Sequence, residues 1–402
     1  MSKIKNVTSY LGPGFIIAAT GVGAGDMVAA TVAGANYGTV ILWAVVLGAI
    51  LKYVLNEGIA RWQLSTGTTM LSAWINKLHP FTSYYFIAYL VLWSFIVSGA
   101  LMAACGLAAH AIFPQISIAV WGIVHSLVAA ALVLFGRYKI LENIMKVFIL
   151  MMFTTIMFNL FLIDVDWLDL SKNLVVPQIP EGSVKFIFGM IGGVGGSVTL
   201  LSYGYWLSEK GWNGEKYLFT SRVDLRVAYL FTGLFGIAIV VLAAELSPEQ
   251  MSGNKIVLSL SEEIMTTTGT VGQWIFLIGF WGAVFSSMIG VWSGVPYIFE
   301  DFVKTRNQTL QTSLAGKSKY YKSFLLFLAV PPMLLLFLDR PVWIIVVYSV
   351  AGAFFMPFLA GTLLYLNNKI KWVKNFKNDT ITNALLVITL ILFVYLLVLK
   401  LI

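Results

Sequence analysis

Two glycine-rich clusters are the parts of this 402-residue chain whose residue types and spacing are best suited to chemistry. Residues 21–26 read GVGAGD, and residues 192–197 read GGVGGS. Runs of glycine favour unwound backbone, whose free carbonyl oxygens can ligate a cation and whose free N–H groups can hold an anion. Asp26 adds a charged ligand to the first cluster, and Ser197 adds a hydroxyl to the second. The clusters therefore indicate a site for a small ion or small solute, built largely from main chain.

The composition places these clusters in a membrane protein. Hydrophobic residues make up 59% of the chain and charged residues 11%, whereas about 25% of a soluble domain is charged. Residues 78–136 contain no Asp, Glu, Lys or Arg. A soluble domain cannot hide so long an apolar stretch, so we expect an all-α integral membrane protein. A single cysteine, Cys105, excludes an intramolecular disulfide and any CxxC site.

Charge gaps and turn residues divide the chain into helical spans that leave no room for a separate soluble domain. Eleven spans are predicted, at about 12–37, 39–65, 83–111, 117–136, 140–163, 184–208, 225–246, 271–300, 322–338, 341–366 and 380–400. Pro331-Pro332 should kink or end a helix. With the N-terminus inside, 20 of the 26 Lys and Arg residues fall on the inner side or on adjacent helix ends. This positive-inside pattern predicts a multi-pass protein of the cell (plasma or inner) membrane with a cytoplasmic N-terminus.

The two clusters lie near the middle of the first and sixth predicted spans. These spans open two halves of five spans each, residues 12–163 and 184–366, and residues 380–400 form an additional span. An odd number of spans in each half gives the halves opposite orientations. Glycine interruptions at matching positions of inverted halves point to the midplane site of a transporter. The alternative is that the glycines serve close helix packing.

Asp26 has two interpretations. A carboxylate at mid-membrane costs about 2.5 kcal/mol or more, so it must be paired, hydrated or neutralised. It could ligate a cation or a proton beside the break. It could also cap the second half-helix by accepting hydrogen bonds from the N–H groups of Val28 or Ala29. One carboxylate could do both.

Motifs in order along the chain resemble the Nramp (natural resistance-associated macrophage protein) family of divalent-metal permeases, which have the LeuT-type fold. The likeness covers about residues 12–366. It rests on the following residues: Gly12-Pro13-Gly14-Phe15, residues 33–38 (AGANYG), Ala60-Arg61, Thr66-Gly67, Tyr138-Lys139, Leu141-Glu142, Lys146, Ser286-Ser287, Gly290, Gly294, Glu300 and Met356-Pro357-Phe358. The resemblance implies a fold with a 5+5 inverted repeat plus one extra helix, in which helices 1 and 6 are broken.

The sequence departs from the family at the functional positions. Where the family has Asp-Pro-Gly-Asn in its first span, this chain has residues 23–26 (GAGD). Where the family has Met-Pro-His in its sixth span, this chain has residues 196–198 (GSV), and Gly193 takes the place of the backbone-carbonyl ligand. The family's acidic proton-relay residues in the third span have no counterpart between 83 and 111, and its tenth-span Gln falls near Ser349.

The loss of soft ligands changes the expected substrate. A thioether selects transition metals, whereas a carboxylate, carbonyls and a hydroxyl suit a hard cation. The first hypothesis is therefore a transporter of a hard divalent cation of the Mg²⁺/Mn²⁺ class, with Asp26, Gly23 and Gly193 as metal ligands. The second is a Na⁺- or H⁺-coupled carrier of a small anion or amino-acid-like solute, held by Gly196, Ser197 and Thr199. The third is a membrane sensor or scaffold that transports nothing.

Further polar and aromatic residues have candidate roles around the site. Ser286 and Ser287 lie in the span that, in LeuT-type carriers, shares a Na⁺ site with the first break, although they could simply pack helices. Tyr203 and Trp206 follow the second break and could gate it, or be ordinary interfacial aromatics. Glu57 and Arg61 are spaced for a salt bridge within one helix.

The sequence also argues against other classes of function. No catalytic elbow, phosphate-binding loop or zinc motif occurs, so we expect no enzyme and no cofactor. The basic residues are scattered over separate loops, which argues against nucleic-acid binding. The expected partners are a small ion or small solute and the lipid bilayer, and no obligate protein partner is evident.

Overall fold

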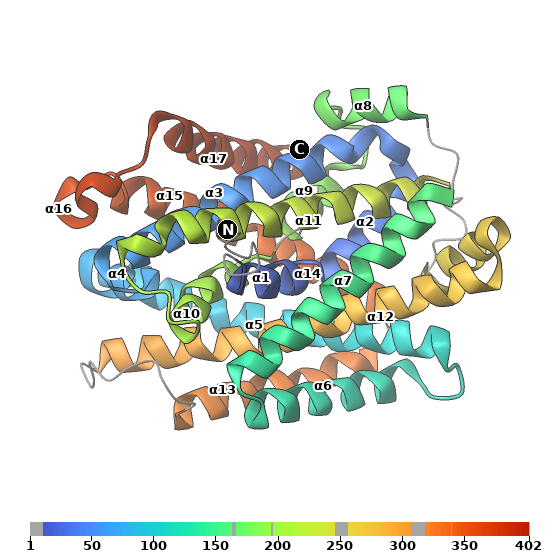
Figure 1. Ribbon diagram of the computed structural model, residues 1–402, viewed down its shortest axis with the longest axis horizontal. Helices are drawn as coiled ribbons and strands as arrows, with labels where there is room; N and C mark the ends of the chain where they lie inside the picture. The colour runs from blue at the N-terminus through green and yellow to red at the C-terminus, as the bar shows by residue number, and fades with distance from the viewer. Residues whose placement is uncertain are drawn as a thin grey trace, which may run out of the picture.

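The computed structural model of the chain is built from helices (Figure 1). It describes residues 11–162, 166–193, 196–245, 256–307, 318–338 and 340–401. The α-helices are α1 Pro13–Gly21, α2 Ala24–Tyr37, α3 Leu42–Thr66, α4 Met70–Lys77, α5 Pro80–Ile112, α6 Ile118–Phe135, α7 Tyr138–Leu162, α8 Trp167–Val175, α9 Val184–Gly193, α10 Ser202–Glu209, α11 Leu218–Ala244, α12 Ile256–Arg306, α13 Lys319–Ala329, α14 Pro341–Ala353, α15 Phe355–Leu366, α16 Ile370–Val373 and α17 Thr380–Leu401. Short 3-10 helices connect several of them, including Gly38–Ile41, η3 Val198–Leu201, Glu215–Tyr217, η7 Pro331–Leu338 and Lys374–Phe376.

Every predicted span coincides with helical structure. Among the described residues, eight helices are long and apolar enough to cross a bilayer by length and composition. The expected stop at Pro331 is confirmed, because α13 ends at Ala329 and Pro331 begins η7. Proline lacks an N–H group and clashes with the preceding turn, which kinks or ends an α-helix; α12 continues through the single Pro296, whereas the pair Pro331-Pro332 ends α13.

Two predicted spans have the wrong bounds. The helix expected over 271–300 is α12, which runs from Ile256 to Arg306 and includes a kink at Gly269, where φ is +72°. The helix expected from 225 is α11, which begins at Leu218. Charged residues mark the edge of the apolar layer, but a helix continues beyond that edge as long as its backbone hydrogen bonds can form.

Two amphipathic helices fill connections for which the sequence predicted no element. The Thr69 side chain caps α4 by accepting from the N–H of Ser72, and Asp166 caps α8 by accepting from Leu168 and Asp169. Ser, Thr and Asp favour such caps because their oxygens satisfy N–H groups that have no partner inside the helix. The two helices lie at opposite ends of the molecule (Figure 1).

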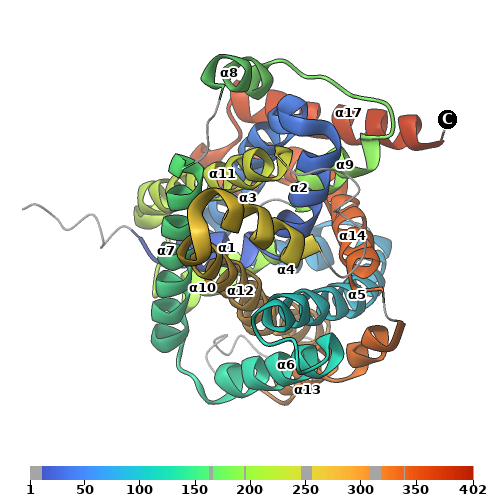
Figure 2. The same cartoon turned by 90° about the vertical axis from the view of Figure 1, so that its right-hand side faces the viewer.

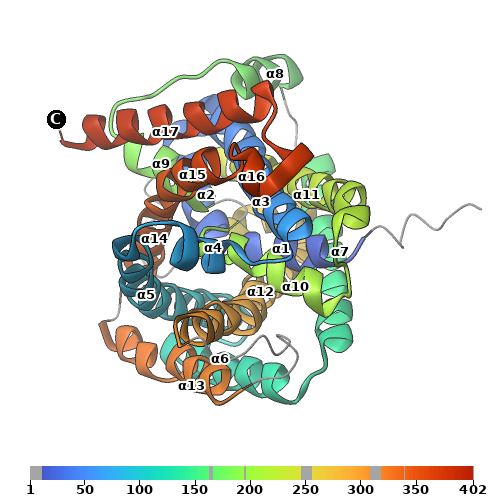
Figure 3. The same ribbon diagram turned by 90° about the vertical axis from the view of Figure 1, so that its left-hand side faces the viewer.

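The first helix lies at the centre of the molecule, enclosed by longer ones (Figure 2). α1 packs against α7, α11 and α12, and α2 packs against α9, α11 and α14. The outer helices α6 and α13 lie beyond α5 and α12. The opposite view shows α4, α10 and α16 gathered at the end of the bundle where α10 approaches α1 (Figure 3). We call this end the α10 face; the other end carries α8.

Candidate functional site

The first helix is broken at the predicted place. α1 ends at Gly21, and α2 begins at Ala24 after an extended Gly23 with φ −117° and ψ −160°. Gly23 is therefore the N-cap residue of α2, and Asp26 is the third residue of that helix rather than its cap. The capping interpretation of Asp26 was wrong about where the helix begins, because the chain regains helical geometry directly after Gly23. The Asp26 side chain lies outside the described part of the chain.

Two serines of α12 donate hydrogen bonds to carbonyl groups that lose their helical partners at the first break. Ser286 Oγ donates to the Ala19 carbonyl oxygen at 3.2 Å, and Ser287 Oγ donates to the Thr20 carbonyl oxygen at 2.7 Å. In a continuous helix these oxygens would accept from N–H groups four residues on. Both serines are buried, with at most 1% of their surface exposed. The expectation that they lie beside the first break is confirmed; their role toward an ion stays a prediction.

Gly23 is required by how closely α12 approaches. A Cβ atom at this position would lie 2.8 Å from the Cβ of Ser287. Real Cβ atoms do not make contacts this short, so any side chain at position 23 would push the serine away from the break. The glycine therefore permits both the extended backbone and the contact with the hydroxyl.

The sixth predicted span is also broken. α9 ends at Gly193, and helical structure returns at Val198 as the 3-10 helix η3, which leads into α10. Gly196 has φ +90°, a conformation that L-residues with side chains rarely adopt. A Cβ on Gly196 would also press on the Thr199 hydroxyl. Ser197 and Thr199 are buried beside this turn, at 1% and 3% exposure.

The two breaks meet inside the protein. A Cβ atom built on Gly196 would lie 4.0 Å from the Cα of Gly21, the last residue of α1. The structure thus brings Gly23, Ser286 and Ser287 to one side of this junction, and Gly196, Ser197 and Thr199 to the other. Unwound backbone inside a bilayer is tolerated only where it is buried in protein or lines a cavity. Here it is buried against the partner break.

Lys52 is a site residue that sequence reasoning missed. Its ammonium nitrogen donates to the Gly192 carbonyl oxygen at 2.8 Å, at the end of α9, and its side chain is 1% exposed. Nothing in the sequence pairs Lys52 with the second break, because Lys52 and Gly192 are 140 positions apart. The sequence feature that could have identified Lys52 is its position in the interior of an apolar span. A charge at that depth is costly and is normally functional.

The salt bridge expected between Glu57 and Arg61 is confirmed. The carboxylate lies 3.1 Å from the Arg61 guanidinium and 2.8 Å from that of Arg222 on α11. Arg61 also donates to the Asn378 side-chain oxygen at 2.8 Å. These residues join α3 to α11 and to the segment before α17, away from the Lys52–Gly192 contact.

Polar donors without a protein partner converge on the second break. Neither the indole nitrogen Nε1 of Trp93 nor the hydroxyl of Ser197 has a hydrogen-bond partner within the described residues, and both are buried. A Cβ atom on Gly352 of α14 would lie 3.0 Å from Ser197 Oγ and 3.7 Å from Trp93 Nε1, so both groups face the same point. An unpaired buried polar group costs about 1–3 kcal/mol, and a bound polar molecule would remove that cost.

Trp93 also lines a cavity between α5 and α14. The cavity has a volume of about 620 Å³ and includes Tyr89, Val350 and, near the start of α9, Lys185. Volumes of about 300–1,000 Å³ are typical of small-molecule sites. The lining also includes Leu92 and Phe354, which are 67% and 41% exposed, so this pocket opens on the outside of the bundle and is not an enclosed chamber at the second break.

Tyr203, one of the two predicted gate residues, is bonded to the first helix through α11. Its hydroxyl donates to Asp224 Oδ2 at 2.9 Å. The same carboxylate accepts from the N–H groups of Gly12 and Gly14, at 2.9 and 2.6 Å, at the start of α1. An anion at a helix N-terminus is favoured by the exposed N–H groups and by the helix dipole. Sequence reasoning missed Asp224, which is 1% exposed.

Other hydrogen bonds join α10 to α12 and α3. Tyr205 donates to Asp301 Oδ2 of α12 at 2.8 Å, and Gln63 of α3 donates to the Gly204 carbonyl at 2.6 Å. Beyond the end of α10, Lys210 contacts Glu142 of α7 at 2.6 Å. Trp206, the second predicted gate residue, is 1% exposed and packs against Gly294. The α10 face is therefore closed by bonds between this helix and its neighbours.

The chemistry of the site is that of binding rather than of bond making. Among the described residues, no group of three or more His, Cys, Asp or Glu side chains could hold a metal ion. Main-chain carbonyls, serine hydroxyls, one ammonium and one indole N–H surround the breaks instead. Such groups can exchange hydrogen bonds with a small charged or polar solute.

Sequence comparison links the chain to one family. The family profile described as "Natural resistance-associated macrophage protein-like" matches residues 14–402. An uncharacterised protein of Pasteurella multocida (strain Pm70) is 23% identical over 342 residues, which is 78% of this chain and 73% of that protein.

Solved structures share the fold. A manganese transporter of Eremococcus coleocola, in complex with an aromatic bis-isothiourea substituted compound, superposes with a TM-score of 0.78 at 15% identity, over 98% of this chain and 86% of the other. MhsT in complex with L-phenylalanine gives 0.60 at 17% identity, over 96% and 97% of the two chains. Mhp1, a nucleobase-cation-symport-1 family transporter, gives 0.60 at 12% identity, over 96% and 92%. The chain therefore has the LeuT-type fold.

Proposed function

The chain belongs to the natural resistance-associated macrophage protein-like (Nramp) family, and from that premise we propose that it moves a hard divalent cation across a membrane by alternating access. The observation that carries the proposal is the contact between the two helix breaks, at Gly21 and Gly196. Broken helices that meet at mid-membrane are where secondary transporters bind their substrates and coupling ions. The family is one of transporters and not of enzymes.

The proposed movement follows from which contacts hold the site closed. The spans containing α1–α2, α3, α9–α10 and α11 would move as a bundle against the remaining helices. Residues 12–163 and 184–366 would be the two inverted repeats, with α17 as an addition. Opening toward the α10 face, which we expect to be cytoplasmic, would require Tyr205 to leave Asp301 and Lys210 to leave Glu142, because each of these pairs joins α10 to a helix outside the bundle.

A hard cation suits the groups that the sequence places at the breaks. The carbonyls near Gly23 and Gly193 and the carboxylate of Asp26 would be its ligands, all of them oxygen atoms. The positions that match the family's Met-Pro-His are residues 196–198 (GSV), which offer no thioether and no imidazole. Soft ligands favour Mn²⁺ and similar metals over Mg²⁺, so this branch of the family would bind Mn²⁺ weakly.

Uptake into liposomes tests this proposal. Purified protein should carry Mg²⁺ or Mn²⁺, and Asp26→Asn should abolish the flux, whereas Cys105→Ala, at a buried position in α5, should not. Micromolar binding of Mn²⁺ by calorimetry would contradict the argument from the missing thioether. Metal flux that is equal in wild type and Asp26→Asn would contradict the ligand assignment.

A second candidate, a Na⁺- or H⁺-coupled carrier of a small anion or zwitterion, is supported by the donors at the second break. Lys52, Trp93 and Ser197 present an ammonium, an indole N–H and a hydroxyl there. These groups bind acceptors such as carboxylates, and an ammonium repels a metal cation. Ser286 and Ser287 would then line the coupling-ion site. Solute uptake that depends on Na⁺ and is unaffected by divalent metals would favour this candidate over the first.

A further inference from the structure

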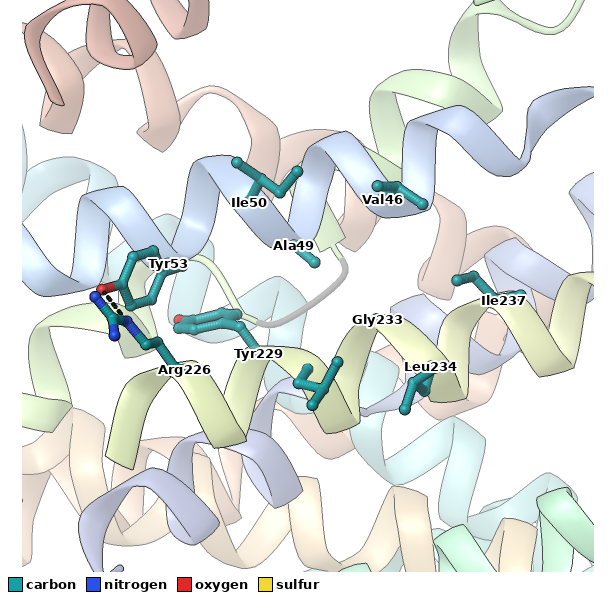
Figure 4. Close-up of a pocket in the computed structure, with 10 residues that line it drawn as sticks. Val46, Ala49, Ile50, Tyr53, Arg226, Tyr229, Gly233, Leu234 and Ile237 are labelled. Carbon is teal, nitrogen blue, oxygen red and sulfur yellow. Dashed lines mark hydrogen bonds between the residues drawn. The ribbon is translucent and has the colours of Figure 1, made fainter. Parts of the chain in front are cut away.

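A groove on the outside of the bundle, between α3 and α11, has the features of a lipid site. Its volume is about 290 Å³, and Figure 4 shows the two antiparallel helices that form its walls. Ala49 and Gly233 form the floor, where a Cβ on Gly233 would lie 3.4 Å from that of Ala49. The rims are apolar and face outward: Ile50 is 44% exposed and Leu230 is 61% exposed. Apolar side chains with so much exposed surface are expected to face the lipid of a bilayer rather than water.

One end of the groove carries a positive charge. Arg226 lines this end and donates from Nε to the Tyr53 hydroxyl at 3.2 Å, as Figure 4 shows. Arg226 is exposed, and within the described residues its two terminal nitrogens have no other bond. One turn before Arg226 on α11, Arg222 shares Glu57 with Arg61, and Asp379 interacts electrostatically with both of these arginines, so three arginines here face two carboxylates. The charge at this end is therefore positive.

The length of the groove matches one leaflet. Its lining on α11 runs from Arg226 to Ile237, and about eleven residues at roughly 1.5 Å each extend about 16 Å. The hydrocarbon core of a bilayer is about 30 Å thick, so the length of the groove is about half the thickness of the core. An acyl chain lying along it would place its headgroup at Arg226.

We propose that this groove binds a phospholipid with an anionic headgroup, whose phosphate contacts Arg226 and whose acyl chain covers Ala49 and Gly233. A phosphate and a guanidinium form charge-assisted hydrogen bonds in a matching fork. A zwitterionic lipid offers the same chain and the same phosphate but also a cationic group, which the positive end of the groove disfavours. The occupant would bridge α3 and α11 on their outer surface, and the site is separate from the helix breaks.

Native mass spectrometry of the full-length protein tests the proposal, with phosphatidylglycerol and phosphatidylcholine of identical acyl chains. One favourable charge near the membrane surface is worth about 1 kcal/mol, so wild type should retain phosphatidylglycerol about fivefold better. Arg226→Gln should remove this preference, and Arg226→Lys should keep most of it. Arg137→Gln is the matched control, because Arg137 is an exposed arginine just before α7 and does not line the groove. It should leave the preference unchanged.

Ala49→Leu tests the floor of the groove independently of charge. The added methyl groups would occupy the space of the chain and should lower retention of both lipids. Three outcomes would overturn the proposal: equal retention of the two lipids by wild type, equal effects of Arg226→Gln and Arg137→Gln, or a dimer that Arg226→Gln or Ala49→Leu dissociates, since a second copy would then occupy the groove. If Ala49→Leu fails to fold, the comparison of Arg226→Gln with Arg137→Gln still tests the proposal.

Discussion

The hydroxyl of Tyr203 lies 2.9 Å from Oδ2 of Asp224, and through that carboxylate it is joined to the start of the first helix. Gly12 and Gly14 donate their N–H groups to the same side chain. α1 and α10 are the halves of the two broken helices that lie at the α10 face, so one residue of α11 fixes both. All three of these elements belong to the proposed moving bundle, so Asp224 keeps the two half-helices in register whether the α10 face is closed or open.

Asp301→Asn should loosen the α10 face, because Asp301 of α12 accepts from the hydroxyl of Tyr205 across the boundary between the bundle and the remaining helices. A hydrogen bond to a charged group is worth about 1.5–3 kcal/mol, so losing the charge should raise the population of open molecules by about tenfold or more. The measurement is alkylation of Ser202→Cys in a Cys105→Ala background, because Ser202 is fully buried on α10. Asp166→Asn, which changes a cap of α8 at the other end, is the control. Equal alkylation rates in all three proteins would show that Asp301 does not hold the face closed.

Ser287→Ala should weaken the response to a coupling ion. The serine hydroxyl now donates to the Thr20 carbonyl, and a cation between the two oxygens would turn the hydroxyl so that both oxygens face it. Removal of one oxygen ligand should raise the Na⁺ concentration for half-maximal uptake about tenfold, if one ligand contributes about 1.4 kcal/mol.

Ser293→Ala is the matched control for this experiment. Ser293 lies on the same helix, but its hydroxyl donates only within that helix, to the Gly290 carbonyl at 3.0 Å. Its removal should leave the ion dependence unchanged. An ion response that survives Ser287→Ala and Ser286→Ala would place the coupling ion elsewhere.

Gly196→Ala should destabilise the protein and impair binding. The residue has φ +90°, and an added Cβ would collide with the Thr199 hydroxyl. A strained backbone conformation costs about 1–3 kcal/mol. Gly361→Ala, where nothing lies within 4 Å of an added Cβ, should be neutral. Thermal unfolding and substrate binding are the measurements. Gly196→Met should perturb binding more than Cys105→Ala does, and equal effects would count against this assignment of the site.

The sequence predicted the features that depend on local residue types. Glycine clusters marked both breaks within a few residues, because no other residue readily tolerates a φ of +90° at Gly196 or the close approach of Ser287 to Gly23. The apolar spans predicted where the helices lie. Ser286 and Ser287 were found through the family resemblance, which implied that their span lies beside the first break.

Contacts between distant parts of the chain could not be predicted. Lys52 and Gly192 are 140 residues apart, and Gly12 and Asp224 are 212 residues apart. Each residue alone has an ordinary explanation, since a lysine can form an ion pair and an aspartate can cap a helix. Which partner it finds depends on how the two halves of the chain pack. A charged residue inside an apolar span nonetheless indicates a functional position, and Lys52 is such a residue.

Replacement of Lys52 should decide between the two cargo hypotheses. Lys52→Met keeps the length of the side chain but removes a buried positive charge from the Gly192 carbonyl. If the cargo is a divalent cation, the repulsion disappears, and calorimetry should show about tenfold tighter binding of Mn²⁺ or Mg²⁺. If the cargo is an anion or a zwitterion, its uptake should fall by a similar factor, because the ammonium would be its counter-charge. Lys52→Arg, which keeps the charge, should resemble wild type in both measurements. Unchanged metal binding together with unchanged solute uptake in Lys52→Met would show that the ammonium only holds the end of α9 and takes no part in selecting the cargo.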